Sequence, residues 1–430
     1  MLDIAGYKLL HDGVIALARV EAAGMRVDLE YLDTALDSIA RDMRSTEEKL
    51  RRSKVWKHWR RRYGTKANLA SGAQLGAVLF EEMGFPCTAR TKTGQPATDE
   101  SALAQVDHAF PREYLRLKKM QKMHGTYLTG IRREVSADGF VRPSFNLHIA
   151  RTMRSSCNNP NLQNVPIRIP EMAGPVRRCF IPRPGHVLVE VDYSGVEVRV
   201  SACYHKDPAM ISYIKDTTKD MHRDMAAQIY KLKPSDVTKA VRHTGKNMFV
   251  FPQFYGDFYI NSAKQMWEAM DTMALTTVGG VALKEHLSRQ GIEERGACNA
   301  KERPHPGTFE HHMKAVETDF WDRRFRVYGQ WKKDWFAAYQ RDGRFNTLTG
   351  FTIDGDMSRN DVINYPVQGS AFHLLLWSLT RMVRWIDKEQ LRSRVVCQIH
   401  DSIVADVHIA ELPRFLAKCK KVMTQDVRDY

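Results

Sequence analysis

The sequence predicts an α+β fold, because strand-like and helical patterns occupy separate stretches of the chain. The run from residue 187 to 191 is apolar apart from Glu190, which is typical of a buried strand. Two further apolar runs lie on either side of His400-Asp401, and they predict a hairpin with Asp401 at its tip. Helical periodicity is clearest in residues 7–23 and 115–127. We therefore expect a small sheet among many helices.

The composition favours a polyanionic partner. The chain has 430 residues, enough for two or three subdomains around a substantial core. Its 65 Lys and Arg residues exceed its 50 Asp and Glu residues, for a net charge of +15, although such a surplus also serves solubility. No apolar run approaches the length of a membrane span, and the N-terminus lacks a signal-peptide core. The seven scattered cysteines lack zinc-site spacing, which predicts reduced thiols in a cytosolic-type compartment.

A long helix is predicted over residues 29–63. It ends in a basic run in which Trp56 and Trp59 are interleaved with arginines and lysines. This run is compatible with a solvated helix face and with contact to the backbone of a nucleic-acid duplex. A capped amphipathic helix is expected after Asn68, and the helix over residues 115–127 carries four basic residues, including Lys122.

A polar, proline-broken loop spans residues 151–168. It is too polar for a core element, and long loops of this kind are usually functional or disordered. Amide side chains suit the minor groove, where every base pair presents acceptors at similar places. The loop therefore predicts sequence-independent contact with a duplex, and an Asn-rich surface turn is the alternative.

Two aspartates follow predicted strands that lie far apart in the sequence. Asp192 ends the first strand, where an unpaired buried carboxylate would be costly unless a cation bound to it. A helix-capping role for Asp192 is the alternative. With Asp401, it forms the kind of carboxylate pair that two-metal phosphoryl transfer needs, in which the cations lie roughly 3.5–4 Å apart.

A cationic helix face is predicted between these aspartates. Arg242 and Lys246 are four residues apart, so they share one face of a helix. Such a face can hold a triphosphate, and the aromatic residues that follow can stack on a base. A solvated helix face is the alternative.

Three segments, taken in order, resemble motifs A, B and C of family A DNA polymerases. They are Asp192-Tyr193-Ser194-x-x-Glu197-x-Arg199, then Arg242-x-x-x-Lys246 with Tyr255-Gly256, then His400-Asp401. The resemblance covers nearly the whole chain. It implies an α+β right-hand fold with an antiparallel palm sheet, a helical thumb and helical fingers. The implied palm comprises residues 1–30, 128–198 and 371–430, the thumb 31–127, and the fingers 199–370.

The resemblance also implies a reaction, the template-directed addition of dNTPs to the 3′ end of a DNA primer. Asp192 and Asp401, with the backbone carbonyl of Tyr193, are the implied ligands of two Mg²⁺ ions, or of Mn²⁺ in their place. Lys246 is also implied in catalysis. The residues implied to bind the incoming nucleotide are Arg242, Lys246, His222, Phe251 and Tyr255, with Glu197 beside Tyr255 as a gate against the ribose 2′-hydroxyl. The implied DNA contacts are Lys122, Arg154, Asn161, Gln163, Asn164, Gln368 and His400.

The chain departs from the family pattern in several places. Ser402 stands where the family usually has a glutamate directly after the motif C aspartate. Motif B is one residue longer than usual, so either Val250 or Phe251 takes the family's aromatic position, and we expect Phe251 because a ring suits a nucleotide pocket. The resemblance fades between residues 255 and 321, where we expect extra fingers helices and a loop, and it recovers over 326–349. The chain ends soon after the helix that follows motif C, which indicates a truncated chain or completion by another chain.

The expected partners are primer–template DNA and dNTPs, without a membrane. The chain begins at the polymerase region, so we expect no proofreading from this polypeptide; a separate exonuclease or processivity subunit is compatible with it. These features suggest a phage or divergent bacterial enzyme that acts in the cytoplasm. The alternatives are a catalytically impaired, polymerase-like DNA-binding protein and a single-subunit RNA polymerase. Glu197 and the loop around Asn161 argue against the RNA polymerase.

Overall fold

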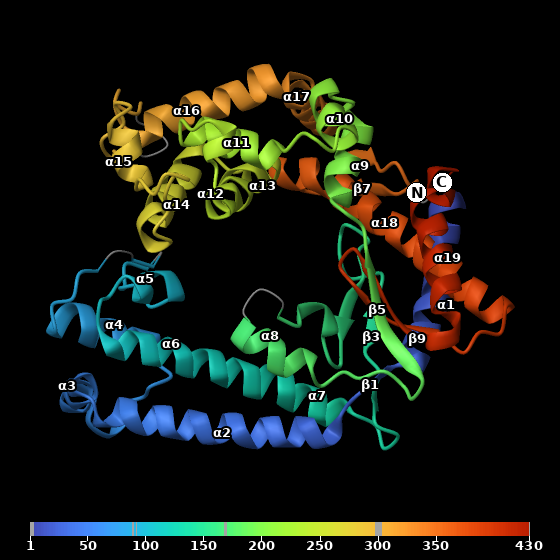
Figure 1. Cartoon of the computed structure of the whole chain (residues 1–430), viewed down its shortest axis with the longest axis horizontal. Coiled ribbons are helices and arrows are strands. Elements are labelled where there is room, and N and C mark those ends of the chain that lie inside the picture. Colours follow the sequence, from blue (N-terminus) through green and yellow to red (C-terminus); the bar gives the residue numbers. More distant parts are fainter. Residues whose placement is uncertain (1–3, 88–89, 92, 167–169, 297–302, 430) are drawn as a thin grey trace. The chain divides into compact units, whose positions relative to one another are not determined.

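The computed structural model describes residues 4–87, 90–91, 93–166, 170–296 and 303–429. Arg168 of the polar loop and residues 297–302 of the segment without resemblance lie outside the described residues. The chain divides into two compact units (Figure 1). The first unit comprises Tyr193–Trp377 with Met1–Asp12 and Leu147–Arg154, and the second comprises Gly13–Asn146, Ser155–Asp192 and Ser378–Tyr430.

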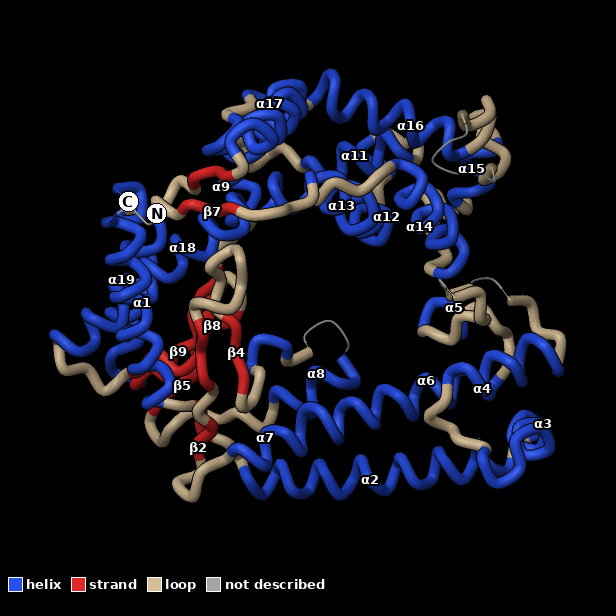
Figure 2. Tube along the Cα trace, turned by 180° about the vertical axis from the view of Figure 1, so that it is seen from behind, coloured by secondary structure: helices blue, strands red, loops and turns tan. Residues whose placement is uncertain are grey.

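A three-stranded antiparallel sheet lies in the second unit. Strand β9 (Ser402–His408) runs between β5 (His186–Asp192) and β8 (Arg394–Ile399), and Figure 2 shows the three strands side by side. The register pairs Asp192 with Ser402. The predicted strand and the predicted hairpin therefore both form, and they pair with each other. The predicted α+β class with an antiparallel sheet is confirmed.

The helices of the second unit include a long antiparallel pair. Helices α2 (Leu29–Arg52) and α6 (Ala109–Lys122) lie side by side in both ribbon views. Asp28 caps α2, because its carboxylate accepts a hydrogen bond from the backbone N–H of Tyr31 at 2.9 Å. The other elements that lie wholly in this unit are β1 (Met25–Arg26), α3 (Lys54–Tyr63), α4 (Gly72–Gly76), α5 (Glu100–Ala104), α7 (Thr129–Glu134), β2 (Phe140–Val141), β3 (Ser144–Asn146), β4 (Ser156–Asn158), α8 (Pro170–Arg177) and α19 (Leu412–Thr424).

The prediction of a single helix over residues 29–63 is wrong in one respect, because these residues form two helices. Ser53 has an extended backbone and ends α2, and its hydroxyl accepts a hydrogen bond from the N–H of Trp56 and so caps α3. Trp56 and Trp59 are both buried in the core of this unit. The basic residues around them therefore lie on the outer face of α3, and the tryptophans are not part of that face.

The first unit is almost entirely helical. Its core contains fully buried aromatic side chains such as Phe249, Phe309 and Phe320, each of which contributes about 1.5–3 kcal/mol through burial. The elements wholly in this unit are α9 (Val196–His205), α10 (Pro208–Lys215), α11 (Met221–Ile229), α12 (Lys239–Thr244), α13 (Phe251–Phe254), α14 (Tyr259–Thr272), α15 (Leu283–Ser288), α16 (Phe309–Asp319), α17 (Arg326–Asp342), β6 (Arg344–Asn346) and β7 (Thr352–Asp354). Helices α1 (Ile4–Ala23) and α18 (Arg359–Lys388) contribute residues to both units.

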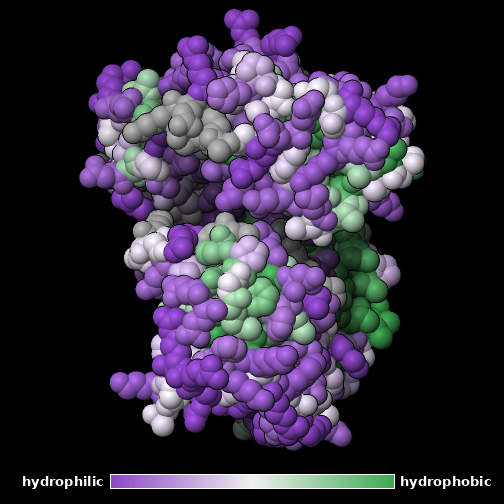
Figure 3. Space-filling model, turned by 90° about the vertical axis from the view of Figure 1, so that its left-hand side faces the viewer, coloured by the Kyte–Doolittle hydropathy of each residue, from purple (hydrophilic) through white to green (hydrophobic). Residues whose placement is uncertain are grey.

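The surface is consistent with the polar composition. The face drawn in Figure 3 is mostly hydrophilic, with apolar patches between the polar residues. Among the described residues, no helix is both long and apolar enough to cross a membrane.

Candidate functional site

The two predicted catalytic aspartates lie at one end of the sheet in the second unit. Asp192 is the last residue of β5 and pairs with Ser402, the first residue of β9. Asp401 directly precedes Ser402 in the turn between β8 and β9, after His400, whose φ of 48° places it in the left-handed region. We call Asp192, Asp401 and Ser402 the aspartate edge. Strand register alone brings Asp192 beside Ser402, the neighbour of Asp401, from positions more than two hundred residues apart in the sequence.

The aspartate edge offers hard oxygen ligands of the kind that Mg²⁺ and Mn²⁺ prefer. Within the described ranges, no group of three or more His, Cys, Asp and Glu side chains is placed to hold a metal ion. A cation at this edge would therefore draw its remaining ligands from backbone carbonyls, water or substrate oxygens. This ligand set suits a site that is completed by a phosphate-bearing substrate.

A π-helical turn in the first unit contains Lys246 and directly precedes Phe251. Helix α12 continues through the π-turn η6 (Gly245–Val250) into α13. A π-helical turn holds an extra residue compared with an α-helical turn, so it accommodates the additional residue of motif B. Val250 is fully buried in the core of this unit, whereas Phe251 is half-buried.

Phe251 contacts the residues that the sequence predicted to bind a triphosphate. Its ring lies 5.0 Å from the ammonium of Lys246 and 5.6 Å, edge to face, from the ring of His222. We call Arg242, Lys246, His222 and Phe251 the cationic cluster. The structure thus groups Phe251, and not Val250, with the predicted nucleotide-binding residues.

The charges of the cationic cluster are arranged by Asp220. This residue caps α11 and accepts a hydrogen bond from Nε of Arg242 at 2.6 Å. Burial opposes its ionisation, but the hydrogen bonds from Arg242 and from the backbone of Arg223 hold its pKa below the ordinary value. Burial, together with the nearby charges of Arg242 and Lys246, lowers the pKa of His222 to about 4.

His222 is therefore a neutral imidazole at physiological pH in the free protein. The resemblance implies that His222 binds the incoming nucleotide, and with this lowered pKa it would carry positive charge only where a bound anion supports its protonation. Its Nδ1 atom is buried and, among the described residues, has no hydrogen-bond partner. Such an atom is suited to hydrogen bonding with a ligand.

Glu197 of α9 is held by two partners in the first unit. Its carboxylate accepts hydrogen bonds from the hydroxyl of Tyr255 and from the guanidinium of Arg154. Nε of Arg154 also donates to the backbone carbonyl of Gln368 at 3.3 Å. The predicted neighbours Glu197 and Tyr255 are thus in direct contact. Arg154, predicted to contact DNA, forms an ion pair with Glu197 that no local sequence pattern indicates.

A groove in the second unit collects four of the predicted DNA contacts. It has a volume of about 790 Å³. Lys122, Gln163, Asn164 and His400 all line it. The other lining residues are Ala70, Gly72, Thr98, Glu100, Tyr114, Leu115, Lys118, Lys119, Tyr127, Val165, Pro166 and Met172. Basic and aromatic side chains in one groove favour a phosphate-bearing polymer.

Gln163 is held by a hydrogen-bond network beneath this groove. Its Nε2 donates to Oε1 of Gln398 at 2.8 Å and to the hydroxyl of Ser155 at 2.9 Å. Nε2 of Gln398 in turn donates to the backbone carbonyl of His400 at 2.7 Å. Ser155 and Gln398 were not predicted as site residues, although a glutamine inside the apolar run of β8 was a usable signal. The network links the polar loop to the turn that carries Asp401.

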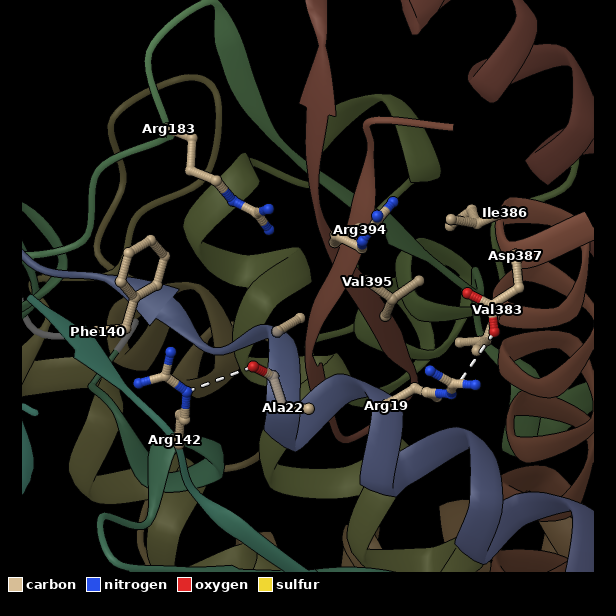
Figure 4. A pocket seen from close by; sticks show the side chains of 11 residues that line it. Arg19, Ala22, Phe140, Arg142, Arg183, Val383, Ile386, Asp387, Arg394 and Val395 are labelled. Carbon is tan, nitrogen blue, oxygen red and sulfur yellow. Dashed lines mark hydrogen bonds and ion pairs between the residues drawn. The ribbon is translucent and has the colours of Figure 1, made fainter. Parts of the chain in front are cut away.

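Asp406, near the end of β9, has a structural role that distinguishes it from Asp401. It is buried and accepts a hydrogen bond from Nε of Arg183 at 2.8 Å. Arg183 lines a cavity of about 400 Å³ in the second unit together with Arg19, Arg142 and Arg394. Figure 4 shows the side chains that line this cavity, with Arg19 paired with Asp387.

Comparison with known proteins places the chain among DNA polymerases. The model of the family described as "DNA polymerase family A" matches residues 37–273 and 344–429. DNA polymerase I of Pseudomonas aeruginosa is 28% identical over 404 residues, which cover 92% of this chain and 39% of the relative. The DNA polymerase of Bacillus phage SP01 is 25% identical over 470 residues, which cover 96% of this chain and 46% of the relative. The chain spans less than half the length of these curated relatives.

A solved structure shares the fold. The polymerase domain of Pol1 from M. smegmatis, in complex with DNA primer-template and dNTP, has a TM-score of 0.74 and 26% sequence identity, and the match covers 96% of this chain and 66% of that one. Residues 274–343, which contain α15, α16 and α17, lie outside the family match, so the match resumes at residue 344 and not at the predicted residue 326. Because the family model matches well over half of its residues, the chain belongs to DNA polymerase family A.

Proposed function

We propose that this protein is a DNA-directed DNA polymerase that adds dNTPs to the 3′ end of a primer. The observation that carries the proposal is the aspartate edge, in which strand register brings Asp192 beside the residue that follows Asp401. The cationic cluster supplies the second requirement, a surface for a triphosphate. Membership of the family supports the same reaction.

Asp192, Asp401 and the backbone carbonyl of Tyr193 would hold two Mg²⁺ ions, or Mn²⁺ in their place. When bound, such ions lower the pKa of the primer 3′-hydroxyl and stabilise the charge on the leaving phosphates. Arg242 and Lys246 bind the triphosphate, and Lys246 holds charge on the departing pyrophosphate. His222 donates a hydrogen bond to a phosphate oxygen, and Phe251 packs against the sugar.

Glu197 provides selectivity for deoxyribonucleotides in this proposal. Tyr255 and Arg154 fix its carboxylate, so it cannot rotate freely away from an incoming sugar. A 2′-hydroxyl placed against a fixed carboxylate side chain would be crowded, whereas a deoxyribose would not. The same contact argues against a single-subunit RNA polymerase.

Primer–template DNA is the proposed partner of the groove in the second unit. Lys122 and its basic neighbours would contact phosphates, and Asn164, Gln163 and His400 would lie near the bases close to the aspartate edge. Such binding depends on salt more than on sequence. We infer a cytoplasmic setting from the bacterial and phage relatives and from the free thiols among the described cysteines.

Primer extension tests the proposal directly. The wild-type chain should extend a primed template with dNTPs and should use rNTPs poorly, and Asp401→Asn should be inactive. Asp387→Asn, which alters an exposed carboxylate paired with Arg19, is the matched control and should remain active. A wild-type protein that binds primer–template DNA without extending it would instead identify a polymerase-like binding protein.

A further inference from the structure

Glu190 interrupts the apolar run of β5, and the proposed function gives it no role. It lies two residues before Asp192, so the two side chains point to the same face of the sheet. Both residues are exposed on that face. Ser402 lies directly opposite Asp192 in the register, so its side chain belongs to the same face.

Glu190 reaches across the sheet to Ser402. The hydroxyl of Ser402 is 3.0 Å from Oε1 of Glu190 and also 3.0 Å from the carbonyl of Ile399, so its single proton is shared between two acceptors. Oε2 of Glu190 lies 3.2 Å from the guanidinium of Arg177. The carboxylate is therefore positioned next to the side chain that faces Asp192.

We propose that Glu190 is a positioning residue for the cations of the aspartate edge. It supplies an additional negative charge from β5, whereas Ser402 of β9 supplies none. This inference rests on the proposed metal-dependent function. Glu190 acts through the electric field and through bridging water, and not as a direct ligand. Asp192 and Asp401 remain the ligands.

The distances make this role physically reasonable. Residues two apart on a strand are separated by about 6.6–6.8 Å, which is less than the Debye length of about 8 Å at physiological salt. The charge of Glu190 therefore acts on a cation at Asp192 with limited screening. A cavity of about 240 Å³, lined by residues that include Arg177, Leu188, Glu190 and Val404, leaves room for water beside the carboxylate.

A purely structural role for Glu190 makes a different prediction. Its contact with Arg177 is half-exposed, and pairs of this kind contribute little to stability. If the pair were only structural, removing either partner would have the same effect. If Glu190 acts on cations, removing Arg177 should strengthen cation binding, because a competing positive charge is lost.

Binding of Mn²⁺ alone to the full chain, measured by electron paramagnetic resonance without DNA or nucleotide, separates these possibilities. Glu190→Gln should weaken Mn²⁺ binding about three- to tenfold, and Arg177→Gln should strengthen it. Glu389→Gln is the matched control, because Glu389 also forms a partly exposed pair with an arginine, Arg414, and it should leave binding unchanged. Thermal unfolding of each variant provides a separate check on folding.

A swap variant extends the test. Glu190→Ser should weaken Mn²⁺ binding as Glu190→Gln does, and adding Ser402→Glu to it should restore the affinity by returning one carboxylate to the same face. The inference is overturned if Glu190→Gln binds Mn²⁺ as Glu389→Gln does, or if Arg177→Gln weakens binding as much as Glu190→Gln. Asp401→Asn distinguishes a failure of this inference from a failure of the proposed function: if Asp401→Asn also leaves Mn²⁺ binding unchanged, the proposed metal site itself is wrong.

Discussion

The aspartate edge and the cationic cluster are held in place by different kinds of structure. Backbone pairing between β5 and β9 fixes the aspartate edge, so its geometry follows directly from strand register. The cationic cluster depends on side-chain packing around a π-helical turn, which buries Val250 and leaves Phe251 beside Lys246. Changes of charge should therefore dominate at the first region, and changes of shape at the second.

The largest effect is expected at the aspartate edge. Asp192→Asn or Asp401→Asn should lower primer extension on the order of a thousandfold, because each removes the charge of a metal ligand. Binding to primer–template DNA, measured by fluorescence anisotropy, should change little, since few phosphate contacts are lost. Extension near the wild-type rate in either variant would contradict the two-metal assignment.

A smaller effect is expected at Glu197, where both shape and charge are involved. Glu197→Ala should improve the use of rNTPs relative to dNTPs by about 10- to 100-fold, because the side chain no longer crowds the 2′-hydroxyl. Glu197→Gln is the matched control, because it keeps the size and removes the charge. Competitive incorporation of rNTPs and dNTPs measures both variants, and unchanged discrimination in Glu197→Ala would assign the residue to a structural pair.

The packing of the π-helical turn can be tested with two neighbouring substitutions. Phe251→Tyr should improve the use of dideoxynucleotides by about fivefold, because a tyrosine hydroxyl can replace the missing 3′-hydroxyl contact at roughly 1 kcal/mol. Val250→Tyr should instead lower the free energy of unfolding by about 1–3 kcal/mol through overpacking of a fully buried site. Relaxed dideoxynucleotide discrimination in Val250→Tyr, and not in Phe251→Tyr, would reverse the assignment.

The same contrast explains which features the sequence could predict. The strands, the hairpin and the position of Asp401 follow from local hydrophobic patterns, and the structure contains all of them. The π-helical turn was not predicted, although the additional residue of motif B was a usable signal, because the packing of Phe249 and Val250 in the core stabilises it. The break at Ser53 was also missed, although a serine that precedes a helix is a recognised capping signal.

Contacts between distant polar side chains were the least predictable part of the candidate site. Arg154 and Glu197 are 43 positions apart, and neither carries a local signal for the other. Gln163 and Gln398 are 235 positions apart, and only the fold brings them together. Residue type predicted that these side chains were functional candidates, whereas their partners depend on tertiary structure.

The smallest expected effect concerns the charge state of the cationic cluster. The pKa of His222 is lowered to about 4, mainly by burial, so the unfolded chain binds a proton near pH 6.5 that the folded protein does not. Its contribution to the free energy of unfolding should therefore decrease as the pH falls from 6.5 to about 4, by about 1–2 kcal/mol after allowance for partial exposure. His222→Gln should lose less stability over this pH window than the wild type. His311→Gln is the control: it alters an exposed histidine of α16 and should lose as much stability as the wild type. Denaturant unfolding at several pH values measures this difference.

Added dNTP should reduce the difference between wild type and His222→Gln, because a bound triphosphate favours the protonated imidazole. If dNTP leaves the difference unchanged, His222 does not contact the triphosphate, and the cationic cluster is limited to Arg242, Lys246 and Phe251.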